Sequence, residues 1–175
     1  VVLIRSGREE GGGATPFDFG TTAVIEEHEQ TEDGRYSLTA RGVQRFKLVE
    51  WLPPRPYPYG RISLIDDTEV DEGPQLRSAM ETVRATFPVY LKLALSLRGE
   101  WARGLKLPAP PHELVNFLGQ WLDAEEDVKQ RLLEIVPASE RVGYLAEALD
   151  DLVTRTREAV IEHRRRKFEA LGSGN

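Results

Sequence analysis

Few residues of this 175-residue sequence stand at spacings that catalysis would require. A phosphate-binding loop ends in Gly-Lys-Ser or Gly-Lys-Thr, whereas the glycine cluster at 11–13 follows Arg-Glu-Glu, whose carboxylates would repel phosphate. None of the seven serines stands in the Gly-x-Ser-x-Gly turn of a hydrolase. Only a serine–lysine dyad, whose members can lie far apart in sequence, escapes this search. We therefore predict a chain without a catalytic site and interpret the glycine cluster as a flexible connection between strands.

Metal and thiol chemistry find equally little support. The chain has no cysteine, which excludes disulfides and thiolate nucleophiles. His28, His112 and His163 lie far apart, and none has a second ligand at the helical or hairpin spacing of a zinc site. The acidic run 66–72 lacks the spacing of a calcium loop. We predict no metal and no cofactor, and we interpret the acidic run as a solvated linker.

Two segments could bind other molecules. The stretch WLPPRPYPYG at 51–60 carries Trp51, Tyr57 and Tyr59 among four prolines, and rigid aromatic side chains on a stiff loop suit peptide recognition. The alternative is that Trp51 and Tyr59 cover the end of a sheet. The run 155–169 holds six Arg or Lys against three Glu, so it could touch acidic partners or RNA, or simply complement a helix end.

Overall charge and hydropathy limit the classes of partner that the chain could bind. A net charge of −6 argues against general nucleic-acid binding, which needs a basic footprint. No apolar run approaches the roughly 18 residues of a membrane span, and no signal sequence opens the chain. We predict a cytoplasmic protein that contacts no membrane.

The front half shows the pattern of an antiparallel sheet. Asp33–Gly34 is a hairpin-turn signal, and after it Tyr36, Leu38 and Ala40 alternate with polar residues. Arg41–Gly42 breaks this alternation, which predicts a bend or bulge before a second run in which Phe46, Leu48 and Leu52 share a face. We expect a β part over 1–72 whose glycines favour a closed or strongly curved sheet.

The period changes to that of helices over 73–175. A first helix is expected to start at Pro74, which suits the first helical position, and to end near Gly99. Pro88 lies inside this helix, and we expect a kink or a split there. A compact stripe from Leu114 to Leu122 predicts a second helix, and Asp123 with Glu126 predicts the cap of a third. Apolar positions from 142 to 160 predict a long last helix with a polar tail.

Taken in order, several segments resemble the Lon protease amino-terminal, or substrate-binding, domain family. They are VVLIRSGREEGG, FGTTAVIEEHEQTEDGRYSLTARGVQRFKLVEWL, PYGRISLIDD and LVNFLGQWLDAEEDVKQRLLEIVPASERVGYLAEAL. The resemblance covers nearly the whole chain. It is most specific at Asp33-Gly34-Arg35 followed by Gly42, Arg45 and Phe46, and at 129–135 followed by Arg141 and Leu145.

The resemblance implies an α+β fold, in which a PUA-like antiparallel β-barrel precedes a carboxy-terminal helical bundle. Family members usually begin with further strands, so either the sequence is a fragment or the barrel is completed another way. Gly34 and Gly42 are expected to supply backbone freedom and Phe46 to lie in the core. Arg35 and Arg45 are expected to fix loops by pairing with carboxylates or carbonyls.

The resemblance also implies a function. Because the ATPase and peptidase segments of the family's proteases are missing from this sequence, the leading hypothesis is a non-enzymatic module of protein quality control that recognises unfolded or degron-bearing polypeptides. One alternative is an RNA-binding PUA-like protein, although the charge makes nucleic acid a poor partner. The other is a structural role, with self-association through the last helix.

Overall fold

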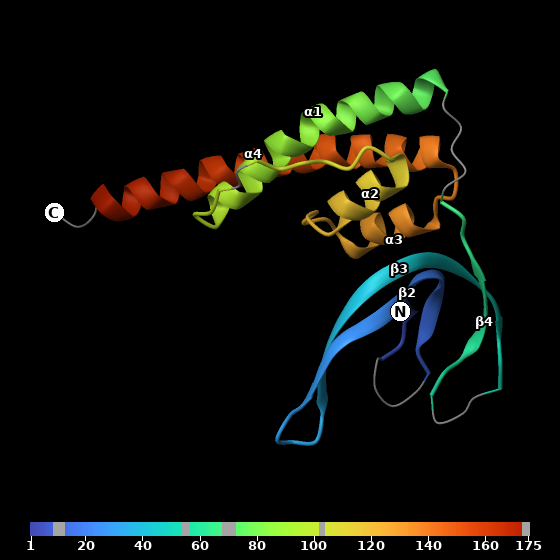
Figure 1. Ribbon diagram of the computed structural model, residues 1–175. Coiled ribbons are helices and arrows are strands. Elements are labelled where there is room, and N and C mark those ends of the chain that lie inside the picture. The colour runs from blue at the N-terminus through green and yellow to red at the C-terminus, as the bar shows by residue number, and fades with distance from the viewer. Residues whose placement is uncertain (9–12, 54–56, 68–72, 102–103, 173–175) are drawn as a thin grey trace. The chain divides into compact units, whose positions relative to one another are not determined.

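The computed structural model describes residues 1–8, 13–53, 57–67, 73–101 and 104–172. The chain divides into two compact units, Val1–Asp66 and Asp67–Asn175. Within the described residues, strands make up the first unit and helices the second (Figure 1), in the order β1 (Val2–Ser6), β2 (Thr15–Gln30), β3 (Tyr36–Trp51), β4 (Gly60–Leu64), α1 (Pro74–Leu97), α2 (Pro111–Gly119), α3 (Glu126–Glu134) and α4 (Ala138–Gly172). The α+β class is confirmed. The predicted boundary at 72/73 borders the stretch 68–72, which lies outside the described residues, and it stays a prediction.

The first unit is an antiparallel meander. The strands pair in the order β1-β2-β3-β4, and β2 and β3 bend strongly along their length (Figure 1). Among the described residues, β1 and β4 each pair with one neighbour only. The sheet is therefore curved, as expected, but it is open rather than closed into a barrel. The predicted glycine-rich connection falls between β1 and β2, with residues 9–12 outside the described part.

The β2–β3 hairpin turns where the sequence predicts. Gly34 has a φ of 82°, a value that glycine adopts without strain, and its N–H donates to the Thr31 carbonyl at 2.9 Å. The Thr31 hydroxyl donates to Asp33 Oδ1 at 2.5 Å, and this bond is the main cause that lowers the pKa of Asp33. Arg35 pairs with the Asp33 carboxylate at 3.4 Å, as expected of a loop-fixing arginine.

The predicted bulge lies at Val43. Thr22 pairs with Gln44 and Ala23 with Gly42, so β3 carries one residue more than β2 between these pairs. The expectation that Gly42 supplies backbone freedom is wrong, because Gly42 is not among the described glycines with a positive φ. A Cβ there would instead lie 3.1 Å from Thr21 Cγ2, so close packing rather than backbone freedom favours glycine.

Phe46 lies in the core of the first unit, as predicted, and is 7% exposed. It pairs across strands with Gly20. A methyl group on Gly20 would meet the Val1 carbonyl oxygen, Val2 Cγ1 at 2.7 Å and Phe46 Cζ at 2.9 Å. The missing side chain of Gly20 thus lets β1, β2 and the Phe46 ring come together.

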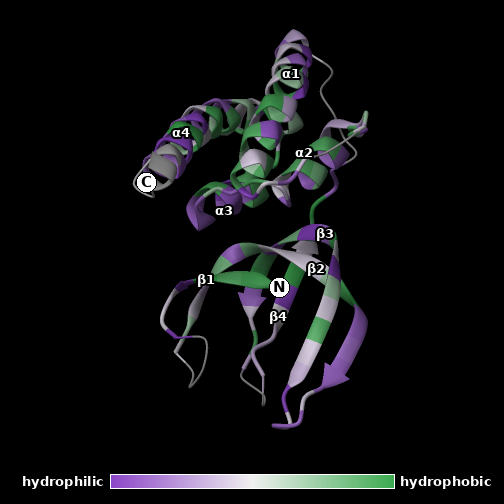
Figure 2. Ribbon diagram, turned by 90° about the vertical axis from the view of Figure 1, so that its left-hand side faces the viewer, coloured by the Kyte–Doolittle hydropathy of each residue, from purple (hydrophilic) through white to green (hydrophobic). Residues whose placement is uncertain are grey.

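The second unit has the larger core. Helices α1 and α4 run side by side (Figure 1), and Figure 2 shows that each carries both apolar and polar residues. The predicted apolar periodicity is confirmed, since Leu76, Val83, Phe87 and Leu91 of α1 are buried. The largest fully buried side chains of the chain all belong to this unit: Tyr90, Phe87, Leu114, Leu118, Leu145, Leu149, Val83, Val115 and Val142.

Helix α1 is continuous through Pro88, so it is not split there, and a kink at Pro88 stays a prediction. The predicted cap of the third helix is wrong. Helix α3 has Glu125 at its N-cap, without a side-chain cap bond, and begins at Glu126. Asp123 does not cap it, because Asp123 lies two residues before the N-cap. The backbone N–H of Asp123 instead donates to the Tyr90 hydroxyl at 2.7 Å, which fixes the turn before the helix. No helix within the described residues is long and apolar enough to cross a bilayer.

We predict that Gly20→Ala destabilises the first unit by about 1–3 kcal/mol, because the added methyl overpacks the contact with Val1, Val2 and Phe46. Hydrogen exchange measured by mass spectrometry reads each unit separately, and faster exchange should be confined to β1–β3. The matched control is Gly143→Ala in α4, where a Cβ meets nothing within 4 Å. The Gly143→Ala substitution should raise the free energy of unfolding by roughly 0.5–1 kcal/mol. Equal changes in the free energy of unfolding for the two substitutions would contradict the packing argument.

Candidate functional site

The three aromatic residues predicted to bind lie at one end of the β3–β4 hairpin. Trp51 ends β3 and pairs with Gly60, and the Leu52 N–H donates to the Tyr59 carbonyl at 3.1 Å. A Cβ on Gly60 would lie 2.6 Å from the Glu50 carbonyl oxygen, so this position must stay glycine. With no side chain opposite it, the Trp51 indole is 46% exposed.

The structure brings the two tyrosines into contact. Their ring centroids lie 6.4 Å apart with planes at 65°, the edge-to-face arrangement that aromatic pairs prefer. Tyr57 is 62% exposed, whereas Tyr59 is partly buried. Residues 54–56 between Trp51 and Tyr57 lie outside the described residues. A binding role for Trp51, Tyr57 and Tyr59 stays a prediction.

An exposed apolar strip continues from this hairpin along β4. Ile62 pairs with Leu48, and Leu64 pairs with Phe46, so the four side chains share one face of the sheet. Ile62 and Leu64 are 40% and 55% exposed. The sequence search did not select these residues, although the alternation in GRISL was the available signal.

The second unit carries an open apolar groove that the sequence did not reveal. Its lining comes from the end of α1 and the loops that follow α1 and α2: Leu91, Leu95, Gly99, Glu100, Trp101, Leu105 and Trp121. Its volume is about 400 Å³, and Trp101 is 78% exposed. Trp121 was expected in the stripe of a helix, but α2 ends at Gly119 and the Trp121 side chain is 44% exposed.

Tyr90 holds one wall of this groove in place. Its hydroxyl accepts from the Asp123 N–H at 2.7 Å and donates to the Trp121 carbonyl at 3.3 Å. Burial raises the pKa of Tyr90, so the phenol stays protonated at neutral pH. One buried side chain of α1 thereby fixes the turn that follows α2.

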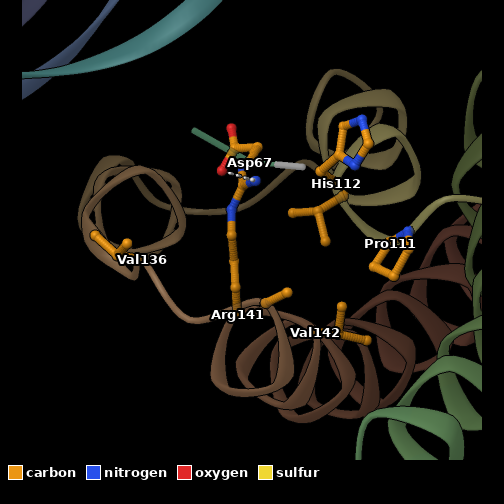
Figure 3. Close-up of a pocket in the computed structure, with 8 residues that line it drawn as sticks. Asp67, Pro111, His112, Val136, Arg141 and Val142 are labelled. Carbon is orange, nitrogen blue, oxygen red and sulfur yellow. Dashed lines mark ion pairs between the residues drawn. The ribbon is translucent and has the colours of Figure 1, made fainter. Parts of the chain in front are cut away.

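Arg141 of α4 organises the other end of the helical unit (Figure 3). Its Nε donates to the Leu132 carbonyl at 2.7 Å, its Nη2 donates to Asn116 Oδ1 at 2.8 Å, and its Nη1 lies 4.0 Å from Asp67 Oδ1. The Arg141 residue is 4% exposed. A single guanidinium therefore joins α4 to α3, to α2 and to the segment at Asp67.

The cavity beside Arg141 is too small for a substrate. Its volume is about 10 Å³, which is the space for roughly one water molecule. His112 lines it together with Val142 (Figure 3). His28 and His163 are exposed elsewhere in the chain, and nowhere in the described part do three His, Asp or Glu side chains gather as a metal would require.

Part of the basic run near the end of α4 is paired within its own helix. Arg165 and Arg166 lie 2.8 Å from the Glu162 carboxylate, and the bonds from these arginines lower the pKa of Glu162. Arg165 also lies 3.8 Å from Glu169. These pairs reduce the positive charge that the run presents to a partner.

Residues 1–151 match the family model described as the ATP-dependent protease La (LON) substrate-binding domain. The chain belongs to this family. The Lon protease of Methylocella silvestris is 26% identical over 145 residues, which are 83% of this chain and 18% of that protein. The Lon protease of Solibacter usitatus is 28% identical over 134 residues, or 77% of this chain and 16% of that protein. The chain thus spans less than a fifth of these two Lon proteases.

Solved Lon domains share the fold. The Lon N-terminal domain protein of Xanthomonas campestris aligns with a TM-score of 0.52 and 19% identity, covering 74% of this chain and 67% of that one. The N-terminal domain of the Mycobacterium avium complex Lon protease aligns with a TM-score of 0.50 and 17% identity, covering 80% and 72%. The family predicted from the sequence is confirmed.

We predict that Arg141→Met lowers the unfolding free energy of the helical unit by about 3 kcal/mol, because the substitution leaves the Leu132 carbonyl and the Asp67 carboxylate without their cation. Urea unfolding followed by far-ultraviolet circular dichroism measures the loss. Arg155→Met is the control, since Arg155 is exposed and pairs with Glu125 and Asp151 at 3.5 Å. It should cost less than about 1 kcal/mol, and equal losses would contradict the role assigned to Arg141.

We predict that Tyr90→Phe lowers the free energy of unfolding of the helical unit by about 1–2 kcal/mol, because the Asp123 N–H loses its acceptor. The pKa of Tyr90 is raised in the folded state, so this contribution is full below the ordinary phenol pKa of about 10 and is lost as pH rises through the raised value. Unfolding in urea at neutral and alkaline pH tests both statements. Tyr144→Phe, at a partly buried tyrosine of the same unit, should change stability little, and a pH-independent difference for Tyr90→Phe would refute the assignment.

Proposed function

We propose that this chain is a Lon-type substrate-binding domain that holds exposed apolar segments of unfolded or degron-bearing polypeptides in protein quality control, without cutting them. The observation that carries the proposal is the apolar surface on the end of the β3–β4 hairpin and along β4. Trp51, Tyr57, Ile62 and Leu64 are each at least 40% exposed. Large apolar side chains gathered in this way mark interaction sites on soluble proteins.

The chemistry of the surface fits an unfolded partner. A folded protein buries its large apolar side chains, whereas an unfolded one presents them, and burying one such side chain is favourable by roughly 1.5–3 kcal/mol. The aromatic rings at Trp51 and Tyr57 offer broad contact without a deep, shape-selective pocket. Such contacts give weak affinity and broad tolerance of sequence.

Charge separates this function from nucleic-acid binding. The chain carries a net charge of −6, and Arg165 and Arg166 near the end of α4 pair with Glu162 and Glu169. Association with RNA would weaken steeply with salt, because it depends on counterion release. Association driven by apolar burial would not.

We predict that the chain binds reduced, carboxymethylated lactalbumin with micromolar affinity that changes little between low and high salt. The double variant Trp51→Ala, Tyr57→Ala should lose about tenfold in affinity, which corresponds to 1.4 kcal/mol. Fluorescence anisotropy of the labelled lactalbumin measures both quantities. Native lactalbumin is the control ligand and should not bind.

Two further variants locate the surface. Val89→Ala removes part of an exposed apolar side chain of α1 and should leave affinity unchanged. Trp101→Ala tests the groove of the helical unit and should have a smaller effect than the double variant. Absence of binding by the unaltered chain would refute the proposed function, and a larger loss with Trp101→Ala would move the site to the helical unit.

A further inference from the structure

The groove of the helical unit has, among the described residues, a single charged side chain in its lining. This side chain is Glu100, and Trp101 and Trp121 line the groove with it, together with leucines of α1 and of the loop that follows. We propose that the groove binds an arginine side chain of a polypeptide partner, whose guanidinium contacts the indoles and the Glu100 carboxylate. All walls of this site belong to the second unit, so it does not rest on the proposed function of the β3–β4 surface or on how the sheet is completed.

The C-terminal turn of α1 places Glu100 at the groove. The Gly99 N–H donates to the Ser96 carbonyl at 3.3 Å, and the Glu100 N–H donates to the Leu95 carbonyl at 2.9 Å. With a Gly99 φ of 71°, these bonds form the Schellman motif that ends many helices. The residue after the glycine frequently packs an apolar side chain against the helix in this motif. Here that residue is glutamate, so a carboxylate stands where an apolar side chain is the common choice.

This departure from the common pattern is typical of a functional position. Glu100 is exposed, and no cation within the described part of the chain forms an ion pair with it. A carboxylate gains nothing from the leucine walls, whereas it attracts a cation that a partner brings. The last carbonyls of α1 add the partial negative charge of a helix C-terminus, which also favours a cation.

Two further charges lie near Tyr90, behind the Trp121 wall of the groove. Burial is the main cause that raises the pKa of Tyr90; the charge of Asp123 also raises this pKa, and the charge of Arg98 lowers it. One negative and one positive charge are therefore close to the phenol. Because they offset each other, they do not cancel the negative charge that Glu100 brings to the lining.

The chemistry of the groove favours arginine over other side chains. A guanidinium is planar, so it can stack on an indole and donate two parallel N–H groups to a carboxylate. Tryptophan is the aromatic side chain that attracts a cation most strongly, and Trp101 and Trp121 are 78% and 44% exposed. The aliphatic part of an arginine can lie along the buried Leu91 and Leu95.

The groove is also small and held in shape before a partner arrives. Its volume of about 400 Å³ is near the lower end for ligand pockets, which suits side chains of an extended segment. The Trp121 N–H donates to the Leu118 carbonyl at 2.8 Å, and its carbonyl accepts from the Tyr90 hydroxyl at 3.3 Å. With Glu100 fixed by the turn of α1, both sides of the site are preorganised, which lowers the entropy cost of binding.

The first test compares two peptides that differ in charge alone. One has the core leucine-arginine-leucine between glycine-serine ends, and the other carries citrulline, the uncharged isostere of arginine, in its place. Isothermal titration calorimetry measures both affinities for the unaltered chain. The arginine peptide should bind about tenfold more tightly, because only it offers a cation to the carboxylate and the indoles. Equal affinities, or no binding of the arginine peptide, would overturn the proposal.

A substitution in the protein isolates the carboxylate. Glu100→Gln should weaken binding of the arginine peptide about tenfold and leave the citrulline peptide within about twofold, since the two changes remove the same interaction. The control Glu81→Gln removes an equal charge from an exposed position of α1, about 21 Å along the helix from Leu95. It should change neither affinity, and equal losses from the two variants would overturn the role of Glu100.

Tryptophan side-chain signals locate the bound peptide. The chain has three tryptophans, Trp51, Trp101 and Trp121, so each indole N–H can be followed in a proton–nitrogen NMR spectrum and assigned by replacing one tryptophan at a time with phenylalanine. The arginine peptide should shift the signals of Trp101 and Trp121 more than the citrulline peptide does. A charge-dependent shift confined to Trp51 would overturn the groove as the site.

The outcomes keep this inference and the proposed function apart. If the arginine peptide binds as expected and lactalbumin does not bind, the proposed function fails and the arginine site stands. If lactalbumin binds and the two peptides bind equally, the arginine site fails and the proposed function stands. If sedimentation shows a dimer that Glu100→Gln dissociates, the groove holds an arginine of a second copy, and the assignment to another polypeptide is overturned.

Discussion

Backbone hydrogen bonding is the constraint on which the first unit depends. Each strand needs a partner for its N–H and C=O groups, and β3 meets this need on both sides by pairing with β2 and β4. In the described part of the chain, β4 meets it on one side only. Within this pairing, β3 has one extra residue at Val43, and the absence of a side chain at Gly20 allows close contact with Phe46.

The two units obtain their stability differently. Among the described residues of the first unit, the buried apolar side chains are Phe46 and Ile65, while the second unit has a core shared by all its helices. A sheet with so small a core relies strongly on its hydrogen-bond ladder. Anything that pairs with its edge would also stabilise it, because a ligand that binds only the folded state shifts the folding equilibrium.

In the helical unit, a buried polar side chain, Arg141, contributes to the internal structure. Its guanidinium is buried and joins Leu132, Asn116 and Asp67 within one unit. A buried cation with these partners fixes the arrangement of helices and leaves little capacity for an outside ligand. The polar groups that Arg141 contacts in the helical unit are thus used for internal order.

The sequence by itself determined the local structure of this protein. The turn at Asp33–Gly34, the bulge before Gln44 and the helix that starts at Pro74 follow from the backbone preferences and apolar spacing of neighbouring residues, and the order of such motifs identified the family. Only the tertiary structure decided that the sheet is open among the described residues and that Arg141 reaches three other segments. It also decided that Asp123 donates its backbone N–H to Tyr90 instead of capping α3 with its side chain. The physical reason is that these features depend on contacts between residues distant in sequence, which spacing along the chain does not encode.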